Sequence, residues 1–287
     1  PKSATKEFLS GLDKINFTAD AIPNFEETNK ILKELTGWEI YAVPGIVEDD
    51  LFFDLMANKK FPATTWVRKK SELDYLEEPD MFHDVFAHIP LLTNQAFVDF
   101  LQAISKFGQE WIDDEWAIHL LSRIYWFTIE FGLIREEEGL RIYGAGILSS
   151  SGETEFSLSD RPNHFDYDVD KILDTPYRKD IMQENYFIID SYEQLFESLP
   201  EIKSKIESRL KERQAVSWSA CLVRMNVVII SYNAGNVQSV TYALNRLGIE
   251  PTLSNDPEVI QSADKVIFPG VGEASTAMKF LKSKGLD

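Results

Sequence analysis

The chain has 287 residues, of which 44% are hydrophobic and 12% aromatic, enough to bury the core of one large domain or two ordinary ones. Its formal net charge of −18 argues against a nucleic-acid or anionic-membrane surface, because phosphate contacts need clustered lysine and arginine. Cys221 is the only cysteine, which excludes an intramolecular disulfide and cysteine-rich metal clusters and indicates a reducing, cytoplasmic compartment.

The sequence contains neither a membrane span nor a signal peptide. No apolar run approaches the roughly 18 residues that cross a bilayer, and the initial stretch PKSATKEFLSGLDK has no apolar signal-peptide core. We therefore expect no membrane association. Because the chain starts without methionine and stops abruptly at LKSKGLD, we also expect it to be trimmed at both ends.

Residues 1–213 predict a mainly α domain with small β elements. Apolar residues recur three and four positions apart in two stretches, which predicts long helices at 97–112 and 116–134. Short strands are predicted within 139–150 and at 186–190. A charged amphipathic helix closes this part, with Pro200 marking its entry or a break.

A different architecture is predicted after residues 214–224, which lack periodicity and read as a linker. Over 225–287, strands and helices alternate. Strands are predicted at 225–230, 249–254 and 264–270, and helices at 236–248, 257–263 and 273–285. This order predicts a partial α/β segment with a parallel sheet and right-handed crossovers.

The stretch HDVFAHIPLL holds two of the four histidines, His83 and His88. On an ideal α-helix, residues five apart point about 140° from each other, so the two imidazoles share a ligand only if the helix deforms. We expect Pro90 to cause the deformation by clashing with the Phe86 carbonyl and pushing Ile89 out of the α region. The two imidazoles then converge.

A third ligand is expected to be a carboxylate within an apolar helix, because a buried charge is costly unless a metal or partner compensates it. Glu130, in IYWFTIEFGLI, fits best. Two histidines and one carboxylate form the facial triad of non-haem Fe(II) oxygenases. A zinc hydrolase with these ligands is an alternative, although the five-residue spacing and Asp84 differ from the HExxH zinc motif. His119 and His164 are predicted at the surface, and the acidic run 110–117 at a helix junction.

Three motifs in the same order carry a family resemblance: FPATTWVRKKSELDYLEEPDMFHDVFAHIPLL, RIYWFTIEFGL and YGAGILSSSGE. From about residue 17 to 210 the chain resembles the pterin-dependent aromatic amino acid hydroxylases, most closely the bacterial phenylalanine type. The resemblance implies Fe(II) held by His83, His88 and Glu130, with tetrahydrobiopterin as reductant and O2 as oxidant. It implies para-hydroxylation of L-phenylalanine to L-tyrosine, with tyrosine or tryptophan hydroxylation as the alternative.

The resemblance also implies roles for individual residues. Arg68 matches the arginine that binds the substrate carboxylate, and Asp80 matches the residue that orients it. The substrate-ring pocket and the segment beside it correspond to Pro79, Trp126, Ser149 and Ser150. The pterin site corresponds to Gly45, Val47, Phe52 and Asp84. Tyr125 matches a tyrosine near the iron.

Alternatives and departures accompany these assignments. Phe52 or Phe53 could equally be a core residue. Asp84 replaces a glutamate of the animal enzymes, and Ala87 replaces the usual glycine, so its methyl group could crowd the pterin side. The sequence has no counterpart of the animal regulatory domain or tetramerisation helix, which predicts a monomer without phenylalanine activation.

The segment from Met225 to Asp287 resembles the start of the glutaminase subunit of imidazole glycerol phosphate synthase, with PGVG at 269–272 matching the loop beside its oxyanion hole. That family's nucleophilic cysteine and its partners lie later in the sequence, so we expect no amidotransferase activity. A working amidotransferase subunit is the alternative. Three parallel strands with an open edge predict a marginal fold that tends to self-associate. We expect a read-through product or a truncated fusion.

Overall fold

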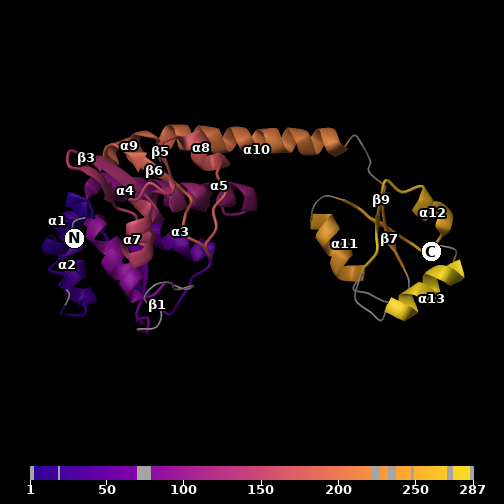
Figure 1. The fold of residues 1–287 in the computed structure, drawn as a ribbon, viewed down its shortest axis with the longest axis horizontal. Helices are drawn as coiled ribbons and strands as arrows, with labels where there is room; N and C mark the ends of the chain where they lie inside the picture. The colour runs from indigo at the N-terminus through magenta and orange to yellow at the C-terminus, as the bar shows by residue number, and fades with distance from the viewer. Residues whose placement is uncertain are drawn as a thin grey trace. The chain divides into compact units, whose positions relative to one another are not determined.

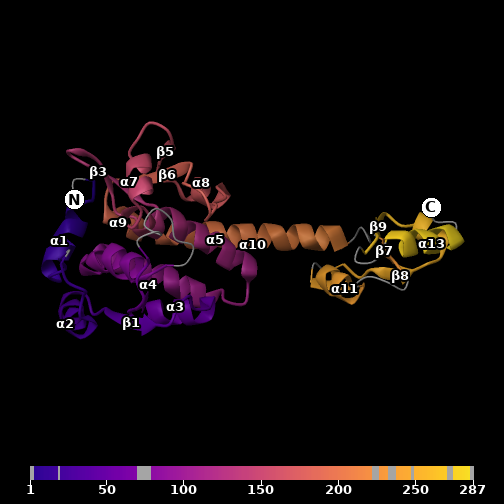
Figure 2. The ribbon, with the colours of Figure 1, turned by 60° about the horizontal axis from the view of Figure 1, so that its bottom comes forward.

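The computed structural model describes residues 3–18, 20–69, 79–221, 226–231, 237–246, 249–269 and 274–284. The chain divides into two compact units, Pro1–Lys211 and Glu212–Asp287. Figures 1 and 2 show both units, which are described separately below.

Helices dominate the first unit, as predicted. Its α-helices are α1 (Lys6–Lys14), α2 (Phe25–Leu35), α3 (Asp49–Ala57), α4 (Gln95–Glu110), α5 (Glu115–Tyr125), α6 (Ala145–Leu148), α7 (Ser151–Ser157), α8 (Val169–Asp174), α9 (Tyr192–Glu197) and α10 (Leu199–Cys221), the last continuing into the second unit. Among the described residues, this unit also has two π-helices, η2 (Phe82–His88) and η4 (Trp126–Glu130), and the 3-10 helix η3 (Ile89–Thr93).

Two small sheets accompany these helices. Strands β1 (Glu39–Val43) and β2 (Lys60–Thr64) pair in parallel. The second sheet has the order β4-β3-β6-β5 and contains β3 (Leu133–Glu136), β4 (Gly139–Ile142), β5 (Asn163–Asp166) and β6 (Asn185–Ile189). Strand β3 begins three residues after the end of η4, so the sheet holds the carboxyl end of that π-helix in place.

Helix α4 runs through the core of the first unit, and Figure 2 shows it as a long magenta helix. Asn94 caps its first turn by accepting a hydrogen bond from the backbone of Phe97 at 3.0 Å. Phe100, Leu101 and Ile104 then bury one face almost completely, and each such side chain contributes about 1.5–3 kcal/mol. This face packs against α3, α5 and α9, which fixes the frame that carries the π-helices.

The second unit contains the predicted parallel sheet. Strand β7 (Val227–Ile230) lies between β8 (Thr252–Ser254) and β9 (Lys265–Ile267), and both pairings are parallel. The helices are α11 (Val237–Arg246), α12 (Pro257–Gln261) and α13 (Ala274–Lys284). The predicted cap Gly248 and residues 270–272 of the PGVG loop lie outside the described residues.

Three boundaries differ from the prediction. The predicted linker is helical as far as Cys221, because α10 continues through it. The predicted helix 116–134 ends at Glu130, and Leu133 already belongs to β3. The stretch 139–150 is divided between β4 and the short helix α6. Among the described residues, no helix is both long and apolar enough to cross a membrane.

Candidate metal centre

Two π-helices carry the predicted ligands. His83 and His88 lie in η2, and Glu130 is the last residue of η4. A π-helix bonds residue i to residue i+5 instead of i+4, so its turns are wider than those of an α-helix. Residues five apart, which diverge on an α-helix, therefore lie one above the other. This geometry places both imidazoles on one face.

The predicted cause of the convergence was wrong. Ile89 keeps helical angles, φ −61° and ψ −36°, and so does His88, with φ −93° and ψ −45°. Pro90 lies inside the following 3-10 helix instead of unwinding the chain. The Ile89 side chain is fully buried, and its packing outweighs the local preference of a residue before proline for extended angles.

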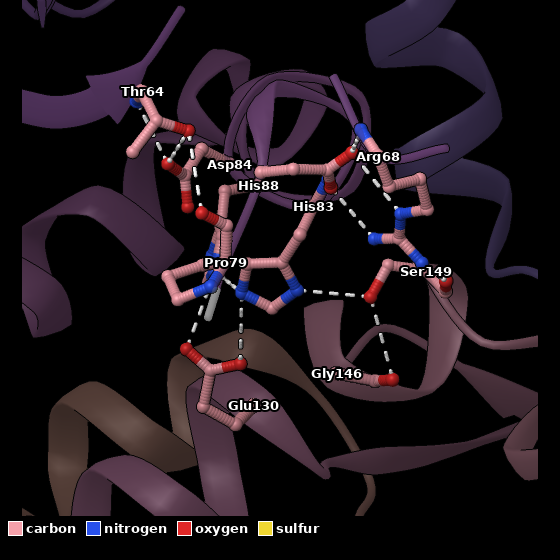
Figure 3. Close-up of polar contacts among 10 residues, drawn as sticks. Thr64, Arg68, Pro79, His83, Asp84, His88, Glu130, Gly146 and Ser149 are labelled. Atoms are coloured by element: carbon pink, nitrogen blue, oxygen red, sulfur yellow. Dashed lines mark hydrogen bonds and ion pairs between the residues drawn. The ribbon is translucent and has the colours of Figure 1, made fainter. Parts of the chain in front are cut away.

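The three side chains converge on one point, as Figure 3 shows. The Nε2 atoms of His83 and His88 lie 3.3 Å apart. One Glu130 oxygen, Oε2, is 3.5 Å from His83 Nε2, and the other, Oε1, is 3.2 Å from His88 Nε2. A cation bound at about 2.0–2.2 Å from nitrogen and oxygen ligands fits such a triangle. The donor set is the two-histidine, one-carboxylate set typical of non-haem Fe(II).

The protonation states suit metal binding. Burial raises the pKa of Glu130, but the adjacent His88 and His83 and hydrogen bonds from His88 and Tyr125 outweigh it and lower this pKa to about 2. Burial lowers the pKa of His83, against the opposing effect of Glu130. At neutral pH the carboxylate is charged and the His83 imidazole is neutral, as metal ligands must be.

Tyr125 connects the carboxylate to a neighbouring aromatic residue. Its hydroxyl bonds to Glu130, and burial raises the pKa of Tyr125 well above its usual value, so it stays protonated and donates. The Phe52 ring lies edge-on to Tyr125, with centroids 5.6 Å apart. Phe53 is 7% exposed and belongs to the core, whereas Phe52 is partly exposed. Phe52 therefore contacts Tyr125, the residue that bonds to Glu130.

Ser149 orients His83 from the far side of the ring. Its Oγ lies 2.9 Å from His83 Nδ1. The tautomer that leaves Nε2 free for a metal carries its proton on Nδ1 and donates it to this oxygen. The residue follows α6 directly, so the short helix places the hydroxyl.

We expect Ser149→Ala to weaken Fe(II) binding about tenfold, because losing such an outer hydrogen bond typically costs 10- to 100-fold in metal affinity. Competition with a fluorescent iron chelator measures this change. The control is Ser151→Ala, an exposed serine two residues along the chain, which is expected to keep the parent affinity. Equal affinities for the two variants would contradict the assigned role.

The first glycine of the YGAG motif, Gly144, allows two backbone segments to touch. A Cβ atom on Gly144 would lie 2.4 Å from the Glu130 carbonyl oxygen and 2.5 Å from the Gly132 nitrogen. We expect Gly144→Ala to cost about 1–3 kcal/mol in unfolding free energy, as over-packing does, and to weaken iron binding by displacing Glu130. Urea unfolding and iron content test this. A variant with parent stability and full iron would show that the contact is unimportant.

A second cluster lies beside the metal centre. Arg68 donates to both oxygens of Asp80, from Nη2 at 2.7 Å and from Nε at 3.1 Å, and these side chains are 7% and 0% exposed. Its Nη1 donates to the Ser149 carbonyl at 3.1 Å. Asp80 also accepts the backbone N–H of His83 at 3.1 Å. Burial raises the pKa of Asp80, but the hydrogen bonds and charge of Arg68 outweigh it and lower this pKa.

Asp84 faces strand β2. Its Oδ2 accepts hydrogen bonds from both the backbone N–H and the hydroxyl of Thr64, each at 2.8 Å, as Figure 3 shows. Burial raises the pKa of Asp84. Thr64 was not singled out in the sequence, because only the fold brings it to η2.

The remaining predicted residues lie as follows. Trp126 opens η4 and stacks on Tyr177, and Pro79 is partly exposed just before Asp80. Gly45 and Val47 lie partly exposed between β1 and α3. His119 is exposed as predicted, whereas His164 is half-buried and bonds the Ser157 carbonyl. The acidic run is a helix junction, where Asp114 caps α5.

Residues 1–244 match the sequence profile of the biopterin-dependent aromatic amino acid hydroxylases, and the chain belongs to this family. A phenylalanine-4-hydroxylase of Chromobacterium violaceum is 44% identical over 239 residues, which are 83% of this chain and 79% of that protein. Another, of Ralstonia nicotianae, is 48% identical over 199 residues, 69% of this chain and 63% of that protein.

The fold agrees with a solved structure of the family. Chromobacterium violaceum phenylalanine hydroxylase, with bound iron(III) and the oxidised cofactor 7,8-dihydrobiopterin, matches with a TM-score of 0.69 and 46% identity. The match covers 74% of this chain and 76% of that chain.

Proposed function

We propose that this chain is a phenylalanine 4-monooxygenase, which converts L-phenylalanine to L-tyrosine with O2, tetrahydrobiopterin and Fe(II). The observation that carries the proposal is the convergence of His83, His88 and Glu130, whose ligand atoms lie within 4.8 Å of one another. When bound, the iron and the reduced pterin supply the activation of O2. A cytoplasmic location suits a chain with a single cysteine.

Arg68 is assigned to the substrate carboxylate. A guanidinium has five N–H donors. Nε and Nη2 each donate one N–H to the Asp80 carboxylate, and Nη1 donates one to the Ser149 carbonyl. One N–H on each Nη then has no partner among the described residues. We assign these two N–H groups to the substrate carboxylate, which a guanidinium binds through two parallel N–H groups. Asp80 fixes the plane of the guanidinium and, through the His83 backbone, its distance from the metal.

The site's aromatic rings limit water near the metal. Phe61 packs against the His88 ring with centroids 4.8 Å apart, and the His88 and Glu130 side chains are only 4% and 12% exposed. A dry site strengthens the electrostatic interactions within it and limits side reactions. Trp126, Pro79 and Ser149 are assigned to the wall around the substrate ring, and Tyr125 holds the Glu130 carboxylate.

The pterin is assigned to the side of the metal that carries Phe52. Its partly exposed ring offers an aromatic surface next to Tyr125, and offset or edge-on aromatic contacts contribute about 0.5–1.5 kcal/mol. Gly45 has no atom within 4 Å of where a Cβ would lie, so its backbone is open to a planar ligand, and Val47 follows on the same loop. Asp84 is assigned to the same cofactor, held by Thr64.

The direct test is tyrosine formation from phenylalanine by protein loaded with Fe(II) and supplied with tetrahydrobiopterin and O2. We expect the amount of tyrosine formed to equal the amount of pterin oxidised. Removal of iron by a chelator is expected to stop the reaction, and Fe(II), but not Zn(II), to restore it. Restoration by zinc alone would favour the hydrolase alternative, and iron-replete protein without tyrosine formation would contradict the proposal.

Three aromatic amino acids, phenylalanine, tyrosine and tryptophan, are the candidate substrates. The bacterial relatives are named phenylalanine hydroxylases, which supports phenylalanine over tyrosine and tryptophan. Small differences in pocket shape discriminate by about 1–3 kcal/mol. A panel of the three amino acids at equal concentration therefore tests the assignment, and a higher kcat/KM for tyrosine or tryptophan would overturn it.

We further propose that residues 225–287 are the beginning of a glutaminase-like domain without activity, joined to a hydroxylase domain of residues 1–213 by residues 214–224. The parallel order β8-β7-β9 with intervening helices supports this assignment. Residues 225–287 contain no cysteine, so they do not include the nucleophile of a glutaminase. Incubation with glutamine is expected to release no ammonia, and release would contradict the assignment.

A further inference from the structure

Glu153 is a buried carboxylate outside the metal centre. It lies on α7 and is 6% exposed. Its Oε1 accepts two hydrogen bonds, from the Tyr186 hydroxyl and from the Gln183 backbone N–H, the latter at 3.0 Å. Burial raises the pKa of Glu153, and these two bonds oppose the rise. Because burying such a group is costly, its partners must be held in a defined arrangement.

Gln183 connects Glu153 to Trp126, because its backbone bonds to Glu153 and its side chain bonds to Trp126. Its side-chain Oε1 accepts the indole Nε1–H of Trp126 at 2.9 Å. Its Nε2 donates to the carbonyls of Arg178 at 2.8 Å and Ile181 at 3.1 Å. Reversing the amide would place N–H against N–H and oxygen against two carbonyls. The amide therefore has one orientation, and the residue is 5% exposed.

The Trp126 ring is held on its face and at its edge. It stacks on Tyr177 with centroids 4.4 Å apart and an angle of 16°, and it packs on Phe131 at 4.6 Å. Stacking alone lets a ring slide and turn in its own plane. The hydrogen bond from Nε1 to Gln183 removes that freedom, because it fixes one point on the edge of the ring.

The network also connects the two sides of the site. Glu153 donates its backbone N–H to Ser150 Oγ at 3.2 Å, and Ser150 follows Ser149, which contacts His83 and Arg68. At the other end, Trp126 begins the π-helix that ends with Glu130. Glu153 therefore lies between the segment that orients one metal ligand and the segment that carries another.

We propose that Glu153, Tyr186 and Gln183 are positioning residues that fix the plane of the Trp126 ring and thereby set how tightly the site holds the aromatic ring of its substrate. The inference rests on the proposed function, in which Trp126 lines the substrate pocket. None of the three residues touches the metal ligands, so their effect is on substrate affinity and not on iron content.

The test is a double-mutant cycle between Gln183→Met, which keeps the size of the side chain but removes its acceptor, and Trp126→Phe, which removes the indole N–H. We expect Gln183→Met alone to raise the KM for phenylalanine about three- to tenfold, the value of one hydrogen bond, with kcat and iron content changed less than twofold. In the Trp126→Phe background the same change is expected to have no further effect. Equal effects in both backgrounds would overturn the proposal.

Two further variants separate positioning from general destabilisation. Glu153→Gln keeps an oxygen that accepts from Tyr186 and Gln183, so it is expected to retain a KM near the parent value, whereas Glu153→Leu shares the rise seen in Gln183→Met. Tyr186→Phe, which loses only a hydroxyl, is expected to raise KM in the same direction and to a smaller extent. Equal KM values for Glu153→Gln and Glu153→Leu would contradict the network.

A readout without catalysis keeps this inference distinct from the proposed function. In metal-free protein labelled with 15N-tryptophan, the indole N–H signal of Trp126 is identified among those of the six tryptophans by its loss in Trp126→Phe. We expect slow hydrogen exchange at this N–H in the parent and exchange at least tenfold faster in Gln183→Met. Unchanged exchange would overturn the network even if the enzyme hydroxylates phenylalanine. Faster exchange in a protein without hydroxylase activity would leave the network standing and overturn only the proposed function.

Discussion

Glu130→Gln is expected to lose Fe(II) affinity by more than about 100-fold and to reduce tyrosine formation to background. The change keeps the shape of the side chain but removes the negative charge that a divalent cation needs beside two neutral imidazoles. The side chain is 12% exposed and lies 3.2–3.5 Å from both histidines, and in the part of the chain that the structure describes no other carboxylate joins this cluster. Iron content after gel filtration and tyrosine formation measure the two effects.

The control is Glu155→Gln, the same substitution at an exposed position on α7, which is expected to keep full iron.

The pH dependence of stability gives a second test of Glu130. The pKa of Glu130 falls from 4.5 to about 2 on folding, so its carboxylate stabilises the protein above about pH 4.5 and loses this contribution towards pH 2. In metal-free protein, the difference in unfolding free energy between parent and Glu130→Gln should shrink over that range. A constant difference would contradict the shift.

Arg68→Leu is expected to raise the KM for phenylalanine about 100-fold or more and to cost about 3–5 kcal/mol in unfolding free energy. The stability loss follows because Asp80, which is fully buried, loses its charged partner. The loss of affinity follows because the guanidinium assigned to the substrate carboxylate is gone. Urea unfolding and steady-state kinetics measure the two losses.

Two comparisons separate these effects. Adding Asp80→Asn to Arg68→Leu removes the unpaired charge, so it is expected to recover part of the stability and none of the affinity. Phenylalaninamide lacks the carboxylate. In the parent we expect it to bind much more weakly than phenylalanine, and in Arg68→Leu we expect the two compounds to bind with similar affinity. If the variant still prefers phenylalanine to its amide as strongly as the parent does, Arg68 does not hold the carboxylate.

The sequence predicted which side chains meet at the metal centre better than it predicted how the chain brings them together. The spacing of His83 and His88 showed that an α-helix had to deform. The cause assigned to Pro90 followed from a local backbone preference, whereas the structure keeps Ile89 helical and uses a π-turn. Ile89 keeps helical angles because its side chain is buried in the core. That burial depends on elements distant in the sequence, so local pattern does not predict it.

Residues joined over long sequence distances were not predictable from local pattern. Gln183 lies 57 positions from Trp126, and nothing in the stretch IMQEN distinguishes this glutamine from an exposed one. Thr64 and Asp84 meet only because strand β2 lies beside η2. The continuation of α10 through residues 214–221 was missed, because this stretch has no apolar periodicity, the signal on which helix prediction mainly depends.

The central claim is that His83, His88 and Glu130 together hold one iron ion. Anomalous scattering at the iron edge from crystals of the Fe(II)-loaded protein tests it most directly. We expect a single peak about 2.0–2.3 Å from Nε2 of both histidines and from a Glu130 oxygen, as for nitrogen and oxygen ligands of similar metals. An iron ion at another position, or one bound by the histidines while Glu130 points to solvent, would contradict the account.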